Sequence, residues 1–518
     1  MTQGAVTRLQ LIRLFPNGPL ARGPARNADV SPRAAAPPQW PRMGRGMTQR
    51  WPRRPVLPPV SRRHLLALAA ASPLAACAST PDVNAMVAGD DGQLKHAILG
   101  THSPLSNSER GAVHSSLSPD PSADALQRQF ALQQALSQSP LVTGNTATIL
   151  RDGAQALPAM FAAMQAARDH INLEYFIFAD VVCNGTSLSD VLTDRLRNGV
   201  TVNIIYDAYG SADTPPALFD TLRAAGARVV TFNPLDPLRA KAGWSPNDRD
   251  HRKIMVVDGR VGFTGGINLD KVYENPASAG IPPDNNTRHA YWRDTAVRIE
   301  GPAVAELQKV FFGTWQQQKG PPVAPADYFP PLPRTGVQTI RIIASAPGDQ
   351  QPLYYISLMT AVLSATQRVW LSSGYFVPPH EEREDLDRTA RAGIDVRVVA
   401  PSHSDVQSAV YAARAAYGDL LQSGAHIYEV HNAVLHSKLA TVDGVWSVVG
   451  SSNLDRRSVV FNNEIDAIIL GRDTAGQVEA ILRQDMAMSH EITLAAWQRR
   501  SVAERWDEIK ARLWQYWM

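Results

Sequence analysis

Two histidine–lysine pairs recur in this sequence within matching surroundings. His251-Arg252-Lys253 and His436-Ser437-Lys438 each precede an Asp-Gly pair by four residues, and each is followed by a Gly-rich turn that ends in Asn268 or Asn453. The two copies stay 185 residues apart throughout. One H-x-K triplet is a weak signal, but two such runs with equal downstream spacing indicate an internal duplication that carries chemistry.

The residue types in both copies suit the cleavage of a phosphodiester. A His and a Lys two positions apart on a strand face the same side, so each half would present an imidazole and an ammonium to one place. One imidazole, from His251 or His436, would attack phosphorus while the other protonates the leaving oxygen. The expected phosphate cradle consists of Lys253, Lys438, Asn268, Asn453 and the backbone at Gly266 and Ser451. No set of metal-ligand residues accompanies the motifs, so neither a metal nor a cofactor is implied.

Further acidic residues complete this site. A nucleophilic imidazole needs an acceptor for its second nitrogen. Asp294 lies 43 residues after His251, and Glu464 lies 28 residues after His436, so we expect an orienting acid downstream in each half. Asp258 and Asp443 belong to the catalytic motifs, but Asp-Gly between apolar runs is typical of a hairpin turn. We therefore expect these two aspartates to fix the turn beneath the site.

The elements that must hold these residues are also written twice. Helical segments at 156–169, 188–197 and 217–225 alternate with β-branched runs that follow a glycine, and residues 369–428 repeat the pattern. This alternation predicts an α/β fold: two duplicated α/β/α halves, each with a mixed, mostly parallel sheet, paired about a pseudo-two-fold axis with the site between them.

These residues resemble the phospholipase D superfamily with its paired H-K-D motifs, and within it the bacterial cardiolipin synthases. The similarity covers about residues 141–500 and includes Trp292-Arg293-Asp294 and Asn463-Glu464. It implies a phosphatidyl group carried on one histidine, usually that of the first half, His251, and passed to the hydroxyl of a second phospholipid. The implied substrates are phosphatidylglycerol and, in a variant reaction, phosphatidylethanolamine at a membrane surface. The alternative is hydrolysis, as a phospholipase D-type phosphodiesterase or a nuclease; a non-catalytic lipid-binding lipoprotein is a third hypothesis.

The charge distribution argues against nucleic acid. The formal net charge is +3, but residues 1–64 hold twelve Arg, no Lys and one acid, Asp29, which leaves −8 for the remainder. A nucleic-acid binder usually has a net basic domain.

The front of the chain is typical of an export signal. Ser61-Arg62-Arg63 resembles a twin-arginine signal, the following apolar run is too short to span a bilayer, and Leu74-Ala75-Ala76-Cys77 resembles a lipobox with Cys77 as the lipidated residue. The alternative is a chance Ala-rich stretch. We expect a lipoprotein that faces the periplasm or, alternatively, a peripheral protein on the inner membrane.

The predicted organisation has six parts. They are a disordered Pro/Arg-rich leader, 1–60; a signal and lipobox segment, 61–77; a flexible tether, 78–121; a first half, 122–319; a linker, 320–334; and a second half, 335–518, which ends in an amphipathic helix over 502–517.

Overall fold

The computed structural model describes residues 98–100, 103–117, 139–236, 245, 247–349, 352–501, 505, 506 and 510. All of them belong to one compact unit. The leader, the signal segment with Cys77 and most of the predicted C-terminal helix lie outside the described residues. No helix in the described part of the chain is long and apolar enough to cross a bilayer.

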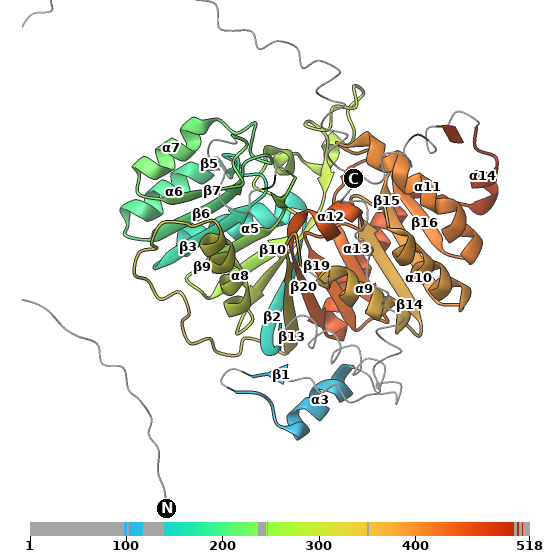
Figure 1. The fold of residues 1–518 in the computed structure, drawn as a ribbon, viewed down its shortest axis with the longest axis horizontal. Coiled ribbons are helices and arrows are strands. Elements are labelled where there is room, and N and C mark those ends of the chain that lie inside the picture. Colours follow the sequence, from blue (N-terminus) through green and yellow to red (C-terminus); the bar gives the residue numbers. More distant parts are fainter. Residues whose placement is uncertain are drawn as a thin grey trace, which may run out of the picture. The chain divides into compact units, whose positions relative to one another are not determined.

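One mixed sheet runs through both halves (Figure 1). In the first half its strands lie in the order β7 (Arg228–Phe232), β6 (Thr201–Asp207), β3 (His170–Tyr175), β9 (Lys253–Val257), β10 (Val261–Gly265), β12 (Thr295–Glu300) and β2 (Leu141–Arg151). In the second half the order is β21 (Ser489–Ile492), β16 (His426–Val430), β15 (Asp395–Pro401), β14 (Arg368–Ser373), β18 (Lys438–Val442), β19 (Trp446–Gly450), β20 (Asn462–Leu470) and β13 (Gln338–Ser345).

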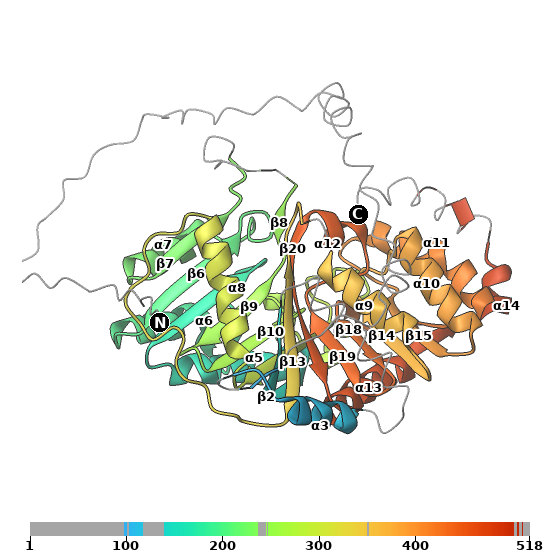
Figure 2. The same cartoon turned by 60° about the horizontal axis from the view of Figure 1, so that its bottom comes forward.

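The two halves meet where equivalent strands pair with each other. Strand β2 pairs with β12 through residues 146–151 and with β13 through residues 142–145, so it belongs to both halves. The β2–β13 pairing is antiparallel, as a two-fold relation between the halves requires, and β13 pairs on its other side with β20 (Figure 2). The predicted duplication and α/β class are therefore confirmed.

Turn chemistry explains why the part of the sheet in each half contains both parallel and antiparallel strands. Strands β3, β6 and β7 are parallel, as are β14, β15 and β16. The motif strands form antiparallel hairpins, β9–β10 and β18–β19, because Asp258-Gly259 and Asp443-Gly444 adopt positive φ at both central turn positions. The hairpin predicted from these Asp-Gly pairs is thus observed.

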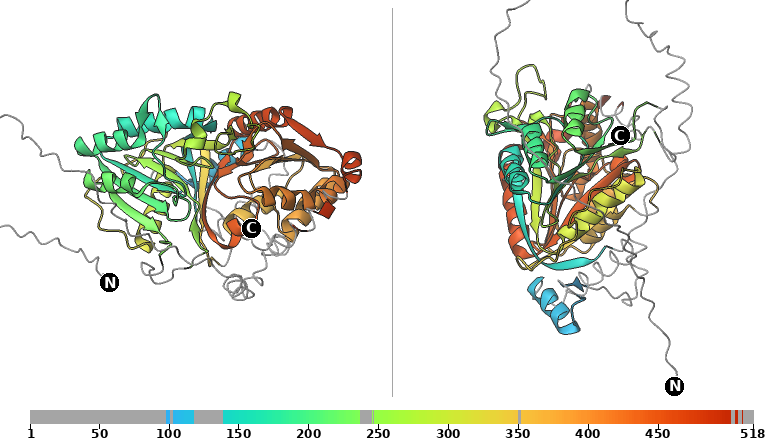
Figure 3. Two further views of the ribbon diagram at one scale, coloured as in Figure 1. Left: turned by 90° about the horizontal axis from the view of Figure 1, so that it is seen from above. Right: turned by 90° about the vertical axis from the view of Figure 1, so that its left-hand side faces the viewer.

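Helices cover both faces of the strands (Figure 3). On β9, Met255 and Val257 pack with α5 and α6, whereas Ile254 and Val256 on the opposite face pack with α8. The main helices are α5 (Asp152–Ala166), α6 (Leu188–Arg197), α7 (Pro216–Ala224), α8 (Val304–Gln317), α9 (Leu353–Leu363), α10 (His380–Arg391), α11 (Gln407–Ser423) and α13 (Arg472–Ala487). Shorter elements are β4 (Val182–Cys183), β5 (Thr186–Ser187), the 3₁₀ helices η3 (Lys271–Glu274) and η4 (Ala277–Ala279), α12 (Arg456–Val460) and α14 (Leu494–Gln498).

Part of the segment predicted as a tether is ordered. Strand β1 (Ile98–Leu99) pairs in parallel with β2, and Ile98 is buried in the core. Helix α3 (Asn107–Leu117) begins with a reciprocal cap, in which the Glu109 carboxylate accepts from the Ser106 N–H and the Ser106 hydroxyl accepts from the Glu109 N–H. The Ser-x-x-Glu capping signal was present in the sequence, but the surrounding Ser and Pro residues obscured it.

Candidate active site

Two short strand pairings bring the motifs of the two halves together. Strand β8 (Arg249–Asp250) pairs in parallel with the first residues of β20, Asn462 and Asn463. Strand β11 (Trp292–Arg293) pairs in the same way with β17 (Val434–Leu435). Each pairing joins the residues before one histidine to the residues before the acid of the opposite half, so the two motifs approach each other across the duplication.

Both histidines line a single cavity. The cavity has a volume of about 570 Å³ and contains His251 and His436 together with Asn268 and Asn453. The imidazole of His251 lies against the Phe176 ring at 5.1 Å between centroids. The cavity therefore brings together the two histidines and the two asparagines whose convergence the sequence motifs predict.

Each imidazole is held by the acid of the other half. His251 Nδ1 lies 3.0 and 3.1 Å from the two Glu464 carboxylate oxygens, and His436 Nδ1 lies 2.8 Å from Asp294 Oδ2. The predicted acids Glu464 and Asp294 both contact a motif histidine, but each contacts the histidine of the opposite half and not the one that precedes it in its own half. The reason is the cross-half pairing, in which the His251 N–H donates to the Asn463 carbonyl and so brings the next residue, Glu464, beside it.

These contacts fix which nitrogen can react. With Nδ1 facing a carboxylate, Nε2 is the nitrogen left to face the cavity.

Two further residues form hydrogen bonds with the acids, and neither was predicted from the sequence. The Tyr273 hydroxyl donates to Asp294 Oδ2 at 2.8 Å, and the Asn462 amide donates to Glu464 Oε1 at 3.1 Å. Asn462 adjoins the acid in sequence, but no pattern in the sequence identified Tyr273.

Gly266 and Ser451 contact the acids instead of the cavity. A Cβ on Gly266 would lie 2.1 Å from Asp294 Oδ1, so the carboxylate occupies the space that any side chain would need. The equivalent Ser451 donates its hydroxyl to Glu464 Oε2. Neither residue lines the cavity. The Gly-rich turns contact and support the acids, and the predicted contact of these two residues with phosphate stays a prediction.

The motif lysines are buried and tied to the histidines. Lys253 Nζ donates to the His251 carbonyl at 2.6 Å, and Lys438 Nζ donates in the same way to the His436 carbonyl. The pKa of Lys253 is lowered to about 7, mainly by burial and also by the charge of Lys438, and burial lowers the pKa of Lys438 to about 8. Neither lysine is among the residues that line the cavity, and each ammonium group lies against the backbone of its histidine.

Burial also sets the charge of each dyad, the pair formed by a histidine and the carboxylate at its Nδ1. It lowers the pKa of His251 to about 4, although the Glu464 carboxylate acts in the opposite direction. Burial alone would raise the pKa of Glu464, but His251 and Lys253 together outweigh it and hold the pKa below its ordinary value. The same forces lower the pKa of His436 and of Asp294. A neutral imidazole facing the cavity is the form that can attack phosphorus.

The two asparagines line the cavity together with the histidines. Asn268 Oδ1 accepts the Ile177 N–H at 3.2 Å, which leaves its Nδ2 group for another partner. Asn453 Oδ1 is buried without a hydrogen-bond partner among the described residues. Both side chains line the cavity, in agreement with their predicted position.

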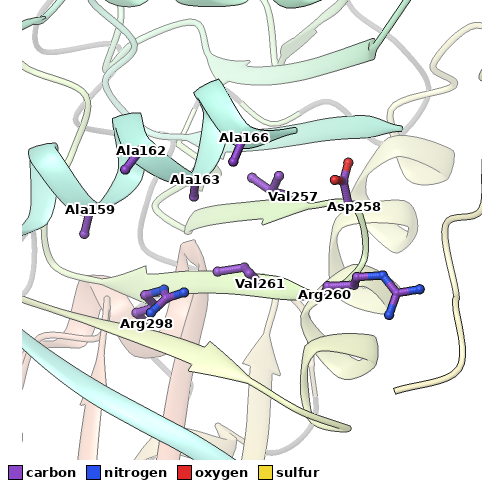
Figure 4. Close-up of a pocket in the computed structure, with 9 residues that line it drawn as sticks. All are labelled: Ala159, Ala162, Ala163, Ala166, Val257, Asp258, Arg260, Val261 and Arg298. Carbon is purple, nitrogen blue, oxygen red and sulfur yellow. The ribbon is translucent and has the colours of Figure 1, made fainter. Parts of the chain in front are cut away.

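The motif aspartates lie away from the reacting groups. Asp258 accepts the backbone N–H groups of Arg168, Asp169 and His170, and Asp443 accepts those of residues 366–368. Asp258 lines a different cavity, of about 430 Å³ against the alanine face of α5 (Figure 4). These contacts match the turn-fixing role expected for both residues and give no support to a catalytic one.

Among the residues that the structure describes, no group of three or more His, Cys, Asp or Glu side chains has an arrangement that could hold a metal ion.

Comparisons with known proteins agree with this geometry. The family model described as "Cardiolipin synthase, PLD-like domain" matches residues 160–275 and 358–486. A cardiolipin synthase of Geobacillus kaustophilus is 32% identical over 386 residues, which cover 74% of each chain. Cardiolipin synthase A of Pseudomonas putida (strain GB-1) is 35% identical over 69% of this chain and 72% of its own. A crystal structure of a phosphatidylserine synthase from Haemophilus influenzae has the same fold, with a TM-score of 0.53 at 12% identity over 76% of this chain and 96% of that one.

The exchange of acids between halves can be tested by histidine NMR. We expect Glu464→Gln to remove the hydrogen-bonded Nδ1 proton signal of His251 and lower its pKa further, with no change at His436. Asp294→Asn should do the reverse. Signals would be assigned with His251→Gln and His436→Gln. The control is Glu491→Gln, which breaks an exposed pair with His426. Loss of the His436 signal in Glu464→Gln would contradict the cross-half pairing.

The lysine pKa values predict an alkaline limit to activity. The predicted role of Lys253 and Lys438 in binding phosphate requires their ammonium forms, which are lost as the pH rises through about 7 to 8. We therefore expect kcat/KM, which reports the free enzyme, to fall above that range. The fall in kcat should occur at a higher pH, because bound phosphate stabilises the ammonium groups and so raises their pKa. A pH profile from 5 to 10 at constant ionic strength would measure both limbs, and a flat profile up to pH 10 would refute the assignment.

Proposed function

Because the chain belongs to the cardiolipin synthase family of phospholipase D-like proteins, we propose that it transfers a phosphatidyl group from one phospholipid to the hydroxyl of another. It is an enzyme of the phosphatidyltransferase class, and its substrates are phospholipids. We propose phosphatidylglycerol as donor and acceptor, which gives cardiolipin and free glycerol.

The reaction proceeds in two displacements at one phosphorus atom. His251 Nε2 attacks phosphorus, the bond to the glycerol oxygen breaks, and His436 Nε2–H gives its proton to that oxygen. The phosphatidyl group is then carried on His251. A glycerol hydroxyl of the second lipid passes its proton to His436 and attacks phosphorus, and the phosphorus–nitrogen bond breaks.

One observation supports this mechanism most directly. Two imidazoles that face a common cavity are each held through Nδ1 by a buried carboxylate, and two buried ammonium groups lie directly behind them. The carboxylates stabilise the imidazolium that forms when His436 takes up a proton. Phosphate charge opposes the effect of burial on the imidazole of His436, so bound substrate favours its acidic form.

The purified chain in micelles of phosphatidylglycerol should form cardiolipin and glycerol in equal amounts. We expect His251→Ala and His436→Ala each to lower turnover by at least about 1,000-fold, because each removes a group needed in both displacements. Lipid products would be separated by chromatography and glycerol measured enzymatically. Phosphatidic acid as the main product would support hydrolysis instead, and substantial activity in either variant would contradict the shared site.

The chain is also proposed to be exported and anchored through lipid on Cys77, which lies outside the described residues. This proposal depends on the twin-arginine and lipobox patterns and agrees with the membrane substrates of the family. Palmitate labelling in a bacterial host should mark the wild type but not Cys77→Ser, with Cys183→Ser as the matched control. Equal labelling of all three proteins would refute the anchor.

A further inference from the structure

The two ends of the catalytic cavity differ in the residues that they present. At the His251 end, Arg249 lies two residues before the histidine and lines the cavity. The equivalent position before His436 is Val434. At the His436 end the cavity wall instead contains the Asp405 carboxylate. Asp455 and Arg457 also line the cavity, and Arg249 lies 3.7 Å from Asp207, so what distinguishes the two ends is the residue each presents, Arg249 at one and Asp405 at the other.

Asp405 is held in place by an aromatic residue that also contacts the histidine. The Tyr375 hydroxyl donates to Asp405 Oδ1 at 2.8 Å, and its ring lies edge-on to the His436 imidazole at 5.9 Å between centroids. Behind the ring, Val377 and Ala409 form a small apolar cluster. Asp405 itself is exposed, and the hydrogen bond from Tyr375 holds its carboxylate at the cavity wall.

The carboxylate has capacity left for a ligand. Its Oδ1 accepts from Tyr375 and from the Ser404 hydroxyl. Among the described residues, neither Lys nor Arg forms an ion pair with Asp405, and no hydrogen bond to its Oδ2 is recorded. It lies close to the reacting groups, because it lines their cavity and is bonded to the tyrosine whose ring contacts His436.

The reaction determines which part of the substrate lies at this end. The leaving oxygen must contact His436 to take its proton, and the incoming hydroxyl must occupy the same place to return one. Both alcohols, the departing headgroup and the acceptor, therefore lie on the His436 side of phosphorus. A carboxylate oxygen there can accept hydrogen bonds from hydroxyl groups next to the reacting one.

We propose that Asp405, positioned by Tyr375, forms a subsite for a vicinal diol, the glycerol headgroup of both donor and acceptor lipids. This inference rests on the proposed phosphatidyl transfer and names what selects the alcohol. It explains how a hydroxyl of a lipid competes with water for the phosphatidyl-histidine, since the subsite holds the diol in position to attack.

The test measures use of the acceptor alcohol separately from reaction with the donor lipid. Phosphatidyl-p-nitrophenol serves as donor because its headgroup is not a diol, and free glycerol serves as acceptor. In Asp405→Asn we expect the glycerol concentration that gives half-maximal phosphatidylglycerol to rise about tenfold, equivalent to about 1.4 kcal/mol. Nitrophenol release without glycerol is measured in the same variant as the reference, because the nitrophenyl headgroup has no vicinal diol for the subsite to hold.

Other acceptor alcohols and other variants test whether the subsite recognises a vicinal diol. Half-saturation by 1-propanol should not change in Asp405→Asn, Asp405→Glu should recover part of the glycerol response, and Tyr375→Phe should weaken it. The control Asp220→Asn, which removes an exposed carboxylate on α7 paired with Arg223, should behave as wild type.

Two results would overturn the subsite. One is an unchanged glycerol response in Asp405→Asn. The other is an equal loss for glycerol, ethanolamine and 1-propanol, which would show a general disturbance without diol recognition. If the wild type incorporates glycerol in an Asp405-dependent way but makes no cardiolipin from phosphatidylglycerol, the subsite stands and the proposed lipid acceptor fails.

Discussion

The site depends on one constraint: each reactive imidazole is oriented by a carboxylate from the opposite half. The residue before Glu464 bonds to the backbone of His251, and the residue before Asp294 bonds to the backbone of His436. Orientation of the imidazoles is therefore coupled to the pairing of the halves along β2, β13 and β20. Any shift between the halves would move both acids relative to both histidines.

Buried arginines keep this interface in register. Arg252 of the first half donates to the carbonyls of Glu464 and Ser345 in the second. Arg293 donates to both oxygens of Asp485 on α13. Buried charges are costly unless they are paired, and here the pairing holds the segments that carry the acids. The same bonds that satisfy these charges thus determine the geometry of the dyads.

The two halves share a backbone plan but differ in the groups behind the histidines. Behind His251, Glu174 lies 3.7 Å from Arg252, and burial raises its pKa well above the ordinary value. At the equivalent register of β14, Ser372 shares a hydrogen bond with Ser437. Two imidazoles with the same geometry thus have different electrostatic surroundings. A reaction that needs a nucleophile and a proton donor requires such a difference.

The sequence predicted the fold class, the convergence of His251 and His436 and the identity of both acids, because the duplication repeats each residue at a fixed offset. It could not predict which half supplies each acid, because spacing along the chain does not specify which strand crosses the interface. Tyr273 could not be predicted for a related reason: it contacts Asp294 from the short helix η3, and the equivalent position in the second half is Ser458.

The exchange of acids between the halves also constrains what a single copy of the repeat can do. One copy of the repeat contains a histidine and an acid that do not meet, so a complete dyad requires two copies in contact, whether joined in one chain or associated as separate ones.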